Sequence, residues 1–220
     1  MHSYANFRGM KLNPKKCKDM IIDFLQYKPS NPNPLRIGPM ELEQVQSYKL
    51  LGVYVSNNLT WDVHCNYIVK KANKRLYAIR ILKKCGLSTL DLIQVYCSII
   101  RSILEYGAPV WSGLPQFLSD LIESVQRRVL RIIYPGLSYE LALVESKLPT
   151  LQSRREELCI KFMSKIQGIS PFDSLLSGLR YSHNITYNLR SGTSKEIRVV
   201  SNTKRFGDFL TVRLQDFLRE

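Results

Sequence analysis

Between residues 60 and 166 the apolar side chains recur every three or four positions, which is the spacing of one face of an α-helix. Glycine and proline interrupt this pattern, so it predicts several helices and not a single long one. Consecutive helices that each bury one apolar stripe fold together as a bundle. We therefore expect residues 59–168 to form an all-helical bundle.

Local signals predict where each helix begins and ends. The first begins at Thr60 or Asp62 and ends near Cys85. The second begins after Ser88, whose hydroxyl can cap it, and is stopped by Pro109. A third helix opens at Ser119 and runs to about residue 135, and two more are predicted at residues 139–146 and 151–166. The residues expected to face the core are Ile68, Ala72, Leu76, Ile79 and Leu82 in the first helix, Leu92, Tyr96, Ile99 and Ile103 in the second, and Leu121, Ile122, Val125, Val129, Ile132 and Ile133 in the third.

The first 58 residues show a different pattern, in which short β-prone runs are separated by turn residues. Strands are predicted at residues 20–25, within residues 35–45 and at residues 48–55, and a proline-rich loop at residues 28–34. These runs predict a small antiparallel sheet that is too small to be stable alone. After residue 168 the helical pattern fades, and residues 169–220 are expected to be a linker with a short irregular or β segment. The expected fold class is α+β, mostly α, in three regions: 1–58, 59–168 and 169–220.

The chain is strongly basic. It carries 32 lysine and arginine residues against 18 aspartate and glutamate residues, a formal net charge of +14 at pH 7. Each third of the chain is positive, so the excess belongs to the folded surface and not to a detachable tail. This charge excludes an acidic, calcium-buffer-like protein and favours a polyanionic partner. The alternative is that the charge serves solubility alone.

Basic residues cluster on three of the predicted helices. Like charges at helical spacing cost a few tenths of a kcal/mol per pair, and bound phosphate groups would offset that cost. The candidate nucleic-acid-binding residues are Lys70, Lys71, Lys74 and Arg75 on the first helix and Arg127, Arg128 and Arg131 on the third. A further cluster on the last helix comprises Arg154, Arg155, Lys161 and Lys165. The alternative is a solvated face whose cations pair with Glu123, Glu156 and Glu157.

The sequence carries no active site that can be recognised by its residues alone. It has no pair of adjacent aspartates and no glycine-rich phosphate-binding loop. His64, Cys65, Cys85 and Cys97 are too widely spaced for a typical zinc site, so we expect no metal and assign them to the core. Five scattered cysteines favour a reducing compartment. Because no signal peptide or membrane-spanning segment is recognisable, we expect an intracellular protein, cytoplasmic or nuclear, that is neither secreted nor in a membrane.

A series of segments, in the same order along the chain, resembles the reverse transcriptases of non-LTR (LINE-type, jockey-like) retrotransposons. KLNPKKCKDM at residues 11–20 resembles the L-N-x-x-K-T-K segment that follows the catalytic motif of these enzymes, and YKLLGV at residues 48–53 resembles their Y-K-Y-L-G-V primer-grip segment. Further similar segments are LTW at 59–61 with His64, LEYGAPVW at 104–111, ESVQRR at 123–128, LPTL at 148–151 with RRE at 154–156, and TKRF at 203–206. The chain departs from the pattern at Cys17, where the family has threonine, and at Leu50, where an aromatic residue is common.

The resemblance implies the last part of an RNA-directed DNA polymerase, with the end of the palm at residues 1–58 and the thumb at 59–168. It implies that Lys16 contacts the phosphates of the incoming nucleotide or protonates the leaving pyrophosphate. The primer grip would comprise Tyr48, Lys49, Leu51 and Gly52, with Gly52 allowing a close approach of the backbone to the primer.

Catalysis in this family uses Mg²⁺ held by an aspartate pair in an F/Y-x-D-D motif, which would precede the first residue of this chain. We therefore expect no cofactor in this chain and no polymerase activity from it alone. The expected partners are an RNA/DNA template-primer hybrid and the remainder of the polymerase, with no membrane.

Two other interpretations remain open. The chain could be a non-catalytic nucleic-acid-binding or scaffolding protein derived from a retroelement, or a helical protein-interaction module with no nucleic-acid role. The affinity of a phosphate-binding protein falls steeply as salt rises. Salt dependence therefore separates the last interpretation from the others.

Overall fold

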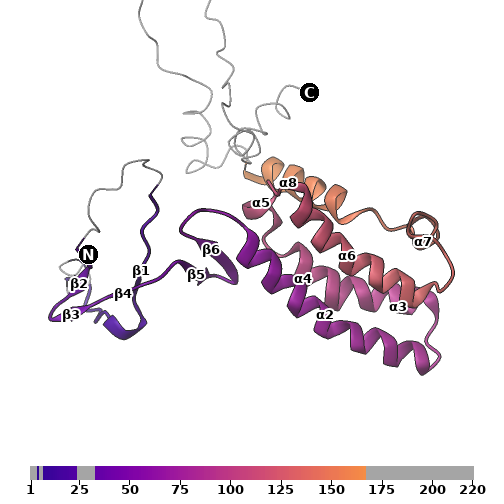
Figure 1. Cartoon of the computed structure of the whole chain (residues 1–220), viewed down its shortest axis with the longest axis horizontal. Helices are drawn as coiled ribbons and strands as arrows, with labels where there is room; N and C mark the ends of the chain where they lie inside the picture. Colours follow the sequence, from indigo (N-terminus) through magenta and orange to yellow (C-terminus); the bar gives the residue numbers. More distant parts are fainter. Residues whose placement is uncertain (1–3, 5–6, 24–32, 167–220) are drawn as a thin grey trace, which may run out of the picture. The chain divides into compact units, whose positions relative to one another are not determined.

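The computed structural model describes Tyr4 and residues 7–23 and 33–166. These residues are mostly helical and include small sheets, which confirms the expected α+β, mostly α class (Figure 1). The chain divides into an N-terminal unit (Met1–Tyr67) and a helical unit (Ile68–Glu220), and the boundary falls inside α2 (Asp62–Lys84). The C-terminal region predicted at residues 169–220 lies outside the described residues.

The described strands belong to the N-terminal unit and form three two-stranded sheets. A short 3₁₀ helix, η1 (Pro14–Lys16), precedes the first strand. β1 (Lys18–Asp19) pairs in parallel with β4 (Glu43–Gln44), whereas the other two pairs are antiparallel, as expected: β2 (Arg36–Ile37) with β3 (Met40–Glu41), and β5 (Ser47–Leu50) with β6 (Val53–Ser56).

The strand predicted at residues 20–25 is wrong over residues 20–23, and residues 24 and 25 lie outside the described residues. Residues 20–23 are in no strand, and Ile22 is 44% exposed instead of buried. A strand needs a partner that supplies hydrogen bonds. Here β4 supplies them two residues earlier, at Lys18 and Asp19, and an ion pair between Lys18 and Glu43 reinforces that register.

The β-prone run at residues 48–55 forms a hairpin, β5–β6, and not a single strand. Its two-residue turn consists of Leu51 and Gly52, which both have positive φ, at 47° and 92°. Positive φ at both central positions defines the type I′ turn, whose backbone matches the twist of the flanking strands. Glycine adopts that conformation without strain, which is the role of Gly52 here. Leu51, at the tip, is 85% exposed.

His64 lies at the start of α2 and is fully buried in the fold. Its Nδ1 accepts a hydrogen bond from the backbone N–H of Tyr54 at 3.3 Å. The ring of Trp61 lies edge-on to the imidazole ring, and the two ring centroids are 6.5 Å apart. Burial disfavours the charged imidazolium and lowers the pKa of His64 to about 4. His64 is therefore neutral in the folded protein at neutral pH.

This lowered pKa predicts a loss of stability in weak acid. The unfolded chain binds a proton at His64 with a pKa near 6.5, so between pH 6.5 and about 4 the unfolded state is protonated before the folded one. The free energy of unfolding should decrease by about 2 kcal/mol from pH 7.5 to pH 5. Urea titrations across this range, compared with His64→Leu, measure the effect. A His64→Leu variant with the same pH dependence as the wild type would contradict it.

The helical region follows the predicted boundaries closely. After α2 come α3 (Thr89–Tyr96), a π-helical turn η2 (Cys97–Arg101), α4 (Ser102–Glu105), α5 (Ala108–Trp111), α6 (Gln116–Ile133), α7 (Tyr139–Ser146) and α8 (Leu151–Ile166). Ser88 and Ser138 cap α3 and α7, each accepting a hydrogen bond from the backbone N–H three residues later. Both predicted bounds of α7 and the predicted start of α8 are confirmed.

Two predicted boundaries are wrong. The second helix ends at Glu105 and not at Pro109, because Gly107 adopts a left-handed conformation with φ of 66°. Pro109 instead occupies the first turn of α5, where its missing N–H costs nothing. The third helix begins at Gln116, directly after Pro115, and not at Ser119.

The π turn changes which residues face the core. Ile100 and Leu104 are buried, whereas Ile99 and Ile103, which regular helical spacing selects, are only half-buried. In an α-helix each step of four residues drifts by about 40° around the axis. The wider π turn takes up this drift, so that Leu92, Tyr96, Ile100 and Leu104 share one buried face.

In the core of the helical unit, α6 packs against α3 and α8, and α8 packs against α5 (Figure 1). Trp111 and Tyr96 are its largest fully buried side chains. Most of the residues that the sequence predicts to face the core are buried. They are Ile68, Ala72, Leu76 and Ile79 of α2 and Ile122, Val125, Val129 and Ile133 of α6. Leu82, Leu121 and Ile132 are half-buried.

No helix among the described residues is both long and apolar enough to cross a bilayer.

Candidate nucleic-acid interface

Helices α2 and α6 lie side by side in the helical unit. The Nη1 of Arg128 donates a hydrogen bond to Oδ1 of Asn73 at 3.1 Å, and its Nη2 donates to the hydroxyl of Ser124 at 3.0 Å. Further along both helices, the ammonium group of Lys83 donates to the backbone carbonyls of Ile132 and Ile133. The two helices therefore run in the same direction (Figure 1).

This pairing gathers basic side chains on one surface, which we call the α2–α6 basic face. Arg128 lies beside Asn73, and one helical turn separates Asn73 from Lys70 and from Tyr77. The face comprises Lys70 and Arg80 of α2 and Arg128 and Arg131 of α6, with Lys74 at its outer edge, about 100° around the helix from Asn73; all five are exposed.

Within the described residues, none of these five cations forms an ion pair with a carboxylate. Arg128 is held by its hydrogen bonds to the neutral side chains of Asn73 and Ser124, which leave its charge unneutralised. Such a surface suits a phosphate backbone, because each bound phosphate releases counterions.

The other predicted cations of these helices lie elsewhere. Two positions along an α-helix rotate a side chain by about 200°, so Lys71 and Arg75 point to the flank of α2 opposite Asn73. On α6, the guanidinium of Arg127 lies over the ring of Tyr139 of α7, 4.9 Å from its centroid. The seven predicted residues are all exposed, but only four of them share one face.

Arg80 is part of the face and was missed by the sequence analysis. It lies two helical turns after Asn73, on the flank that contacts α6. The signal that identifies it is its spacing of seven residues from Asn73, which becomes informative only once Asn73 is known to contact Arg128.

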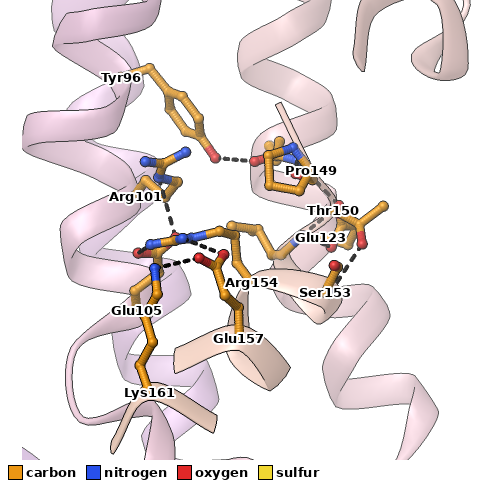
Figure 2. Close-up of polar contacts among 12 residues, drawn as sticks. Tyr96, Arg101, Glu105, Glu123, Pro149, Thr150, Ser153, Arg154, Glu157 and Lys161 are labelled. Atoms are coloured by element: carbon orange, nitrogen blue, oxygen red, sulfur yellow. Dashed lines mark hydrogen bonds and ion pairs between the residues drawn. The ribbon is translucent and has the colours of Figure 1, made fainter. Parts of the chain in front are cut away.

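The cluster predicted on α8 is not a free basic surface. Arg155 is buried and donates a hydrogen bond to the hydroxyl of Ser119 at 2.5 Å. Arg154 forms ion pairs with Glu105 of α4 and Glu157, and Glu157 also pairs with Lys161 (Figure 2).

These contacts shift the ionisation of the paired groups on α8. The hydrogen bond to Glu105 raises the pKa of Arg154, and those from Lys161 and Arg154 lower the pKa of Glu157. Two of the four predicted cations therefore neutralise carboxylates, a third is buried, and Lys165 remains exposed.

Glu123 does not serve as a counter-charge for the arginines of α6. It is buried, and its side-chain oxygens accept hydrogen bonds from the backbone N–H of Leu151 at 3.0 and 3.3 Å and from the hydroxyl of Tyr139. Gln126 joins the same network, donating to Tyr139 at 3.1 Å and accepting from the hydroxyl of Tyr96. Burial raises the pKa of Tyr96. This network is a structural centre that joins α3, α6, α7 and α8.

The remaining site candidates belong to the N-terminal unit. Lys16 is exposed at the end of η1. In the hairpin, the ammonium of Lys49 donates to the hydroxyl of Tyr67 at 2.8 Å and lies 4.5 Å from that ring's centroid and 5.7 Å from that of Tyr54. The hydrogen bond to Tyr67 raises the pKa of Lys49. Tyr48 and Leu51 are exposed, and Gly52 forms the turn. Lys49 is thus held by two tyrosines, while Tyr48 and Leu51 remain accessible.

Within the described part of the chain, no three histidine, cysteine, aspartate or glutamate side chains lie close enough to hold a metal ion.

Comparisons of the chain with protein-family models, with curated proteins and with solved structures found no match.

Proposed function

We propose that the chain binds the sugar–phosphate backbone of an RNA/DNA hybrid through the α2–α6 basic face. The observation that carries this proposal is the set of five exposed cations on two adjoining helices, none of which has a carboxylate partner among the described residues. Like charges that repel one another on a folded surface are stabilised when an anion binds.

The geometry of the face suits recognition of shape and not of sequence. Lys70 and Lys74 are one helical turn apart, so their Cβ atoms lie about 5–6 Å from each other. Arg128 and Arg131 form a second row on α6. Lysine and arginine contacts to phosphates position a duplex without reading its bases, and A-form hybrids are bound in this way.

The family resemblance extends this proposal to a biological role. We infer that the chain is part of a non-LTR retrotransposon reverse transcriptase and contributes primer-template binding inside the cell, in the cytoplasm or the nucleus. On this proposal the helical unit acts as the thumb, and the β5–β6 hairpin as the primer grip, through the accessible Tyr48 and Leu51. Lys16 contributes to nucleotide addition only in the presence of a domain that carries the aspartate pair.

Charge reversal on the two flanks of α2 tests the proposal. Lys70→Glu with Lys74→Glu should weaken binding to a blunt RNA/DNA hybrid about 30-fold at 100 mM salt and reduce the salt slope by about 2. The matched control is Lys71→Glu with Arg75→Glu, which makes the same change in net charge on the opposite flank. It should weaken binding by less than about threefold. Fluorescence anisotropy with a labelled hybrid measures both.

Equal losses in the two double variants would show that net charge and not the α2–α6 basic face drives binding. If the wild-type chain does not bind the hybrid even near 50 mM salt, the proposal is wrong altogether.

A further inference from the structure

A pocket of about 480 Å³ lies where the end of α2 meets the end of α6. Its lining consists of Tyr77, Arg80, Ile81, Lys83, Lys84 and Ile132. It adjoins the α2–α6 basic face, because Arg80 belongs to both and Tyr77 lies one turn after Asn73. Its volume falls within the range of pockets that bind small organic groups.

The pocket combines an accessible aromatic ring with unneutralised charge. Tyr77 is 68% exposed and Ile81 is 37% exposed, so both present apolar surface to whatever enters. Arg80 and Lys84 are exposed and, within the described residues, form no ion pair. No acidic residue is among the lining residues.

The third cation, Lys83, has a structural role. Its ammonium group donates to the carbonyls of Ile132 and Ile133, where it compensates the negative end of α6. This contact joins the two helices between two residues that line the pocket, Lys83 and Ile132. The pocket is therefore built by the packing of α2 on α6 and does not depend on a ligand to form.

We propose that this pocket binds a single unpaired nucleotide at the end of the bound duplex, with its base stacked on Tyr77 and its phosphate bound by Arg80 and Lys84. A nucleotide presents a flat base and a negative charge together, which matches a tyrosine flanked by two cations, and the adjoining basic face suits the rest of the same nucleic acid. The inference rests on the proposed function, since the duplex would be held by the adjoining basic face.

The experiment compares a blunt RNA/DNA hybrid with the same hybrid carrying a short single-stranded overhang that contains 2-aminopurine. The wild-type chain should bind the overhang substrate about tenfold more tightly, which is the contribution of one stacked base. The 2-aminopurine fluorescence should also decrease on binding, because stacking on an aromatic ring quenches it.

Tyr77→Ala should abolish both the tenfold preference and the quenching, while the affinity for the blunt hybrid stays within about twofold of wild type. Tyr77→Phe should retain both, because it keeps the stacking ring. The matched control is Phe117→Ala, which removes another exposed aromatic side chain, 62% accessible, from α6. This control should leave both readouts unchanged.

The outcomes separate this inference from the proposed function. Binding of the blunt hybrid with no preference for the overhang would overturn the nucleotide pocket and leave the basic face intact. An equal loss of affinity for both substrates in Tyr77→Ala would also overturn the pocket, by making Tyr77 part of the duplex-binding surface. Failure of the wild-type chain to bind either substrate would overturn both proposals.

Discussion

Trp111→Ala should lower the free energy of unfolding of the helical unit by about 4 kcal/mol. Trp111 is completely buried, and it is the largest side chain in the core. Its indole Nε1 also donates a hydrogen bond of 3.0 Å to the carbonyl of Tyr106, which closes the turn between α4 and α5. The truncation therefore leaves a large cavity and removes a partner from a backbone carbonyl.

Urea unfolding followed by circular dichroism at 222 nm measures this loss. Trp111→Phe keeps most of the ring volume but not the hydrogen bond, and should cost about 1–2 kcal/mol. The control is Phe117→Ala, an exposed aromatic position on α6, which should change stability by less than about 0.5 kcal/mol. A Trp111→Ala variant as stable as this control would show that the core is not packed around Trp111.

Glu123→Ala should destabilise the helical unit by about 3 kcal/mol. Glu123 is the acceptor for the backbone N–H of Leu151, at the start of α8, and for the hydroxyl of Tyr139 of α7. Its removal leaves these two donors buried without a partner, and each costs about 1–3 kcal/mol. The carboxylate of Glu123 also lies at the N-terminus of α8, where the positive end of the helix dipole stabilises a negative charge.

The same urea titration measures this effect. Glu123→Gln keeps one acceptor oxygen and should cost about half as much. Glu140→Ala, on the exposed surface of α7, is the control and should lie within about 0.5 kcal/mol of wild type. Equal stability of Glu123→Ala and Glu140→Ala would contradict the role assigned to the buried network.

The helical part of the fold could be predicted because its signals are local. Ser88 and Ser138 precede their helices, and glycines follow the ends of α2 and α6, so the boundaries depend on nearby residues alone. The errors occur where tertiary structure decides. A single sequence does not show that η2 contains a π turn, which moves burial from Ile99 to Ile100, nor that β4 pairs with Lys18 and Asp19.

The candidate site could be predicted only in part, for the same reason. Helical spacing places Lys70, Lys74, Arg128 and Arg131 on exposed faces, but it does not say which flank of α2 meets α6. That choice depends on packing and on the hydrogen bond from Arg128 to Asn73. Arginine is usually found on the protein surface. Arg155 is buried because its guanidinium finds a hydrogen-bond partner in Ser119, 36 residues earlier in the chain. The reverse-transcriptase assignment stays a prediction from sequence resemblance.

The π turn at η2 has a consequence for how this sequence can diverge. A turn of this kind holds one residue more than the corresponding α turn. Loss of one codon between residues 97 and 100 would convert it to a regular helix, with Leu92, Tyr96, Ile100 and Leu104 still on one face. The same loss in α6 would rotate every later side chain by about 100° and turn its buried stripe outwards. Alignment gaps between homologous chains should therefore be tolerated at η2 and excluded from the middle of α6.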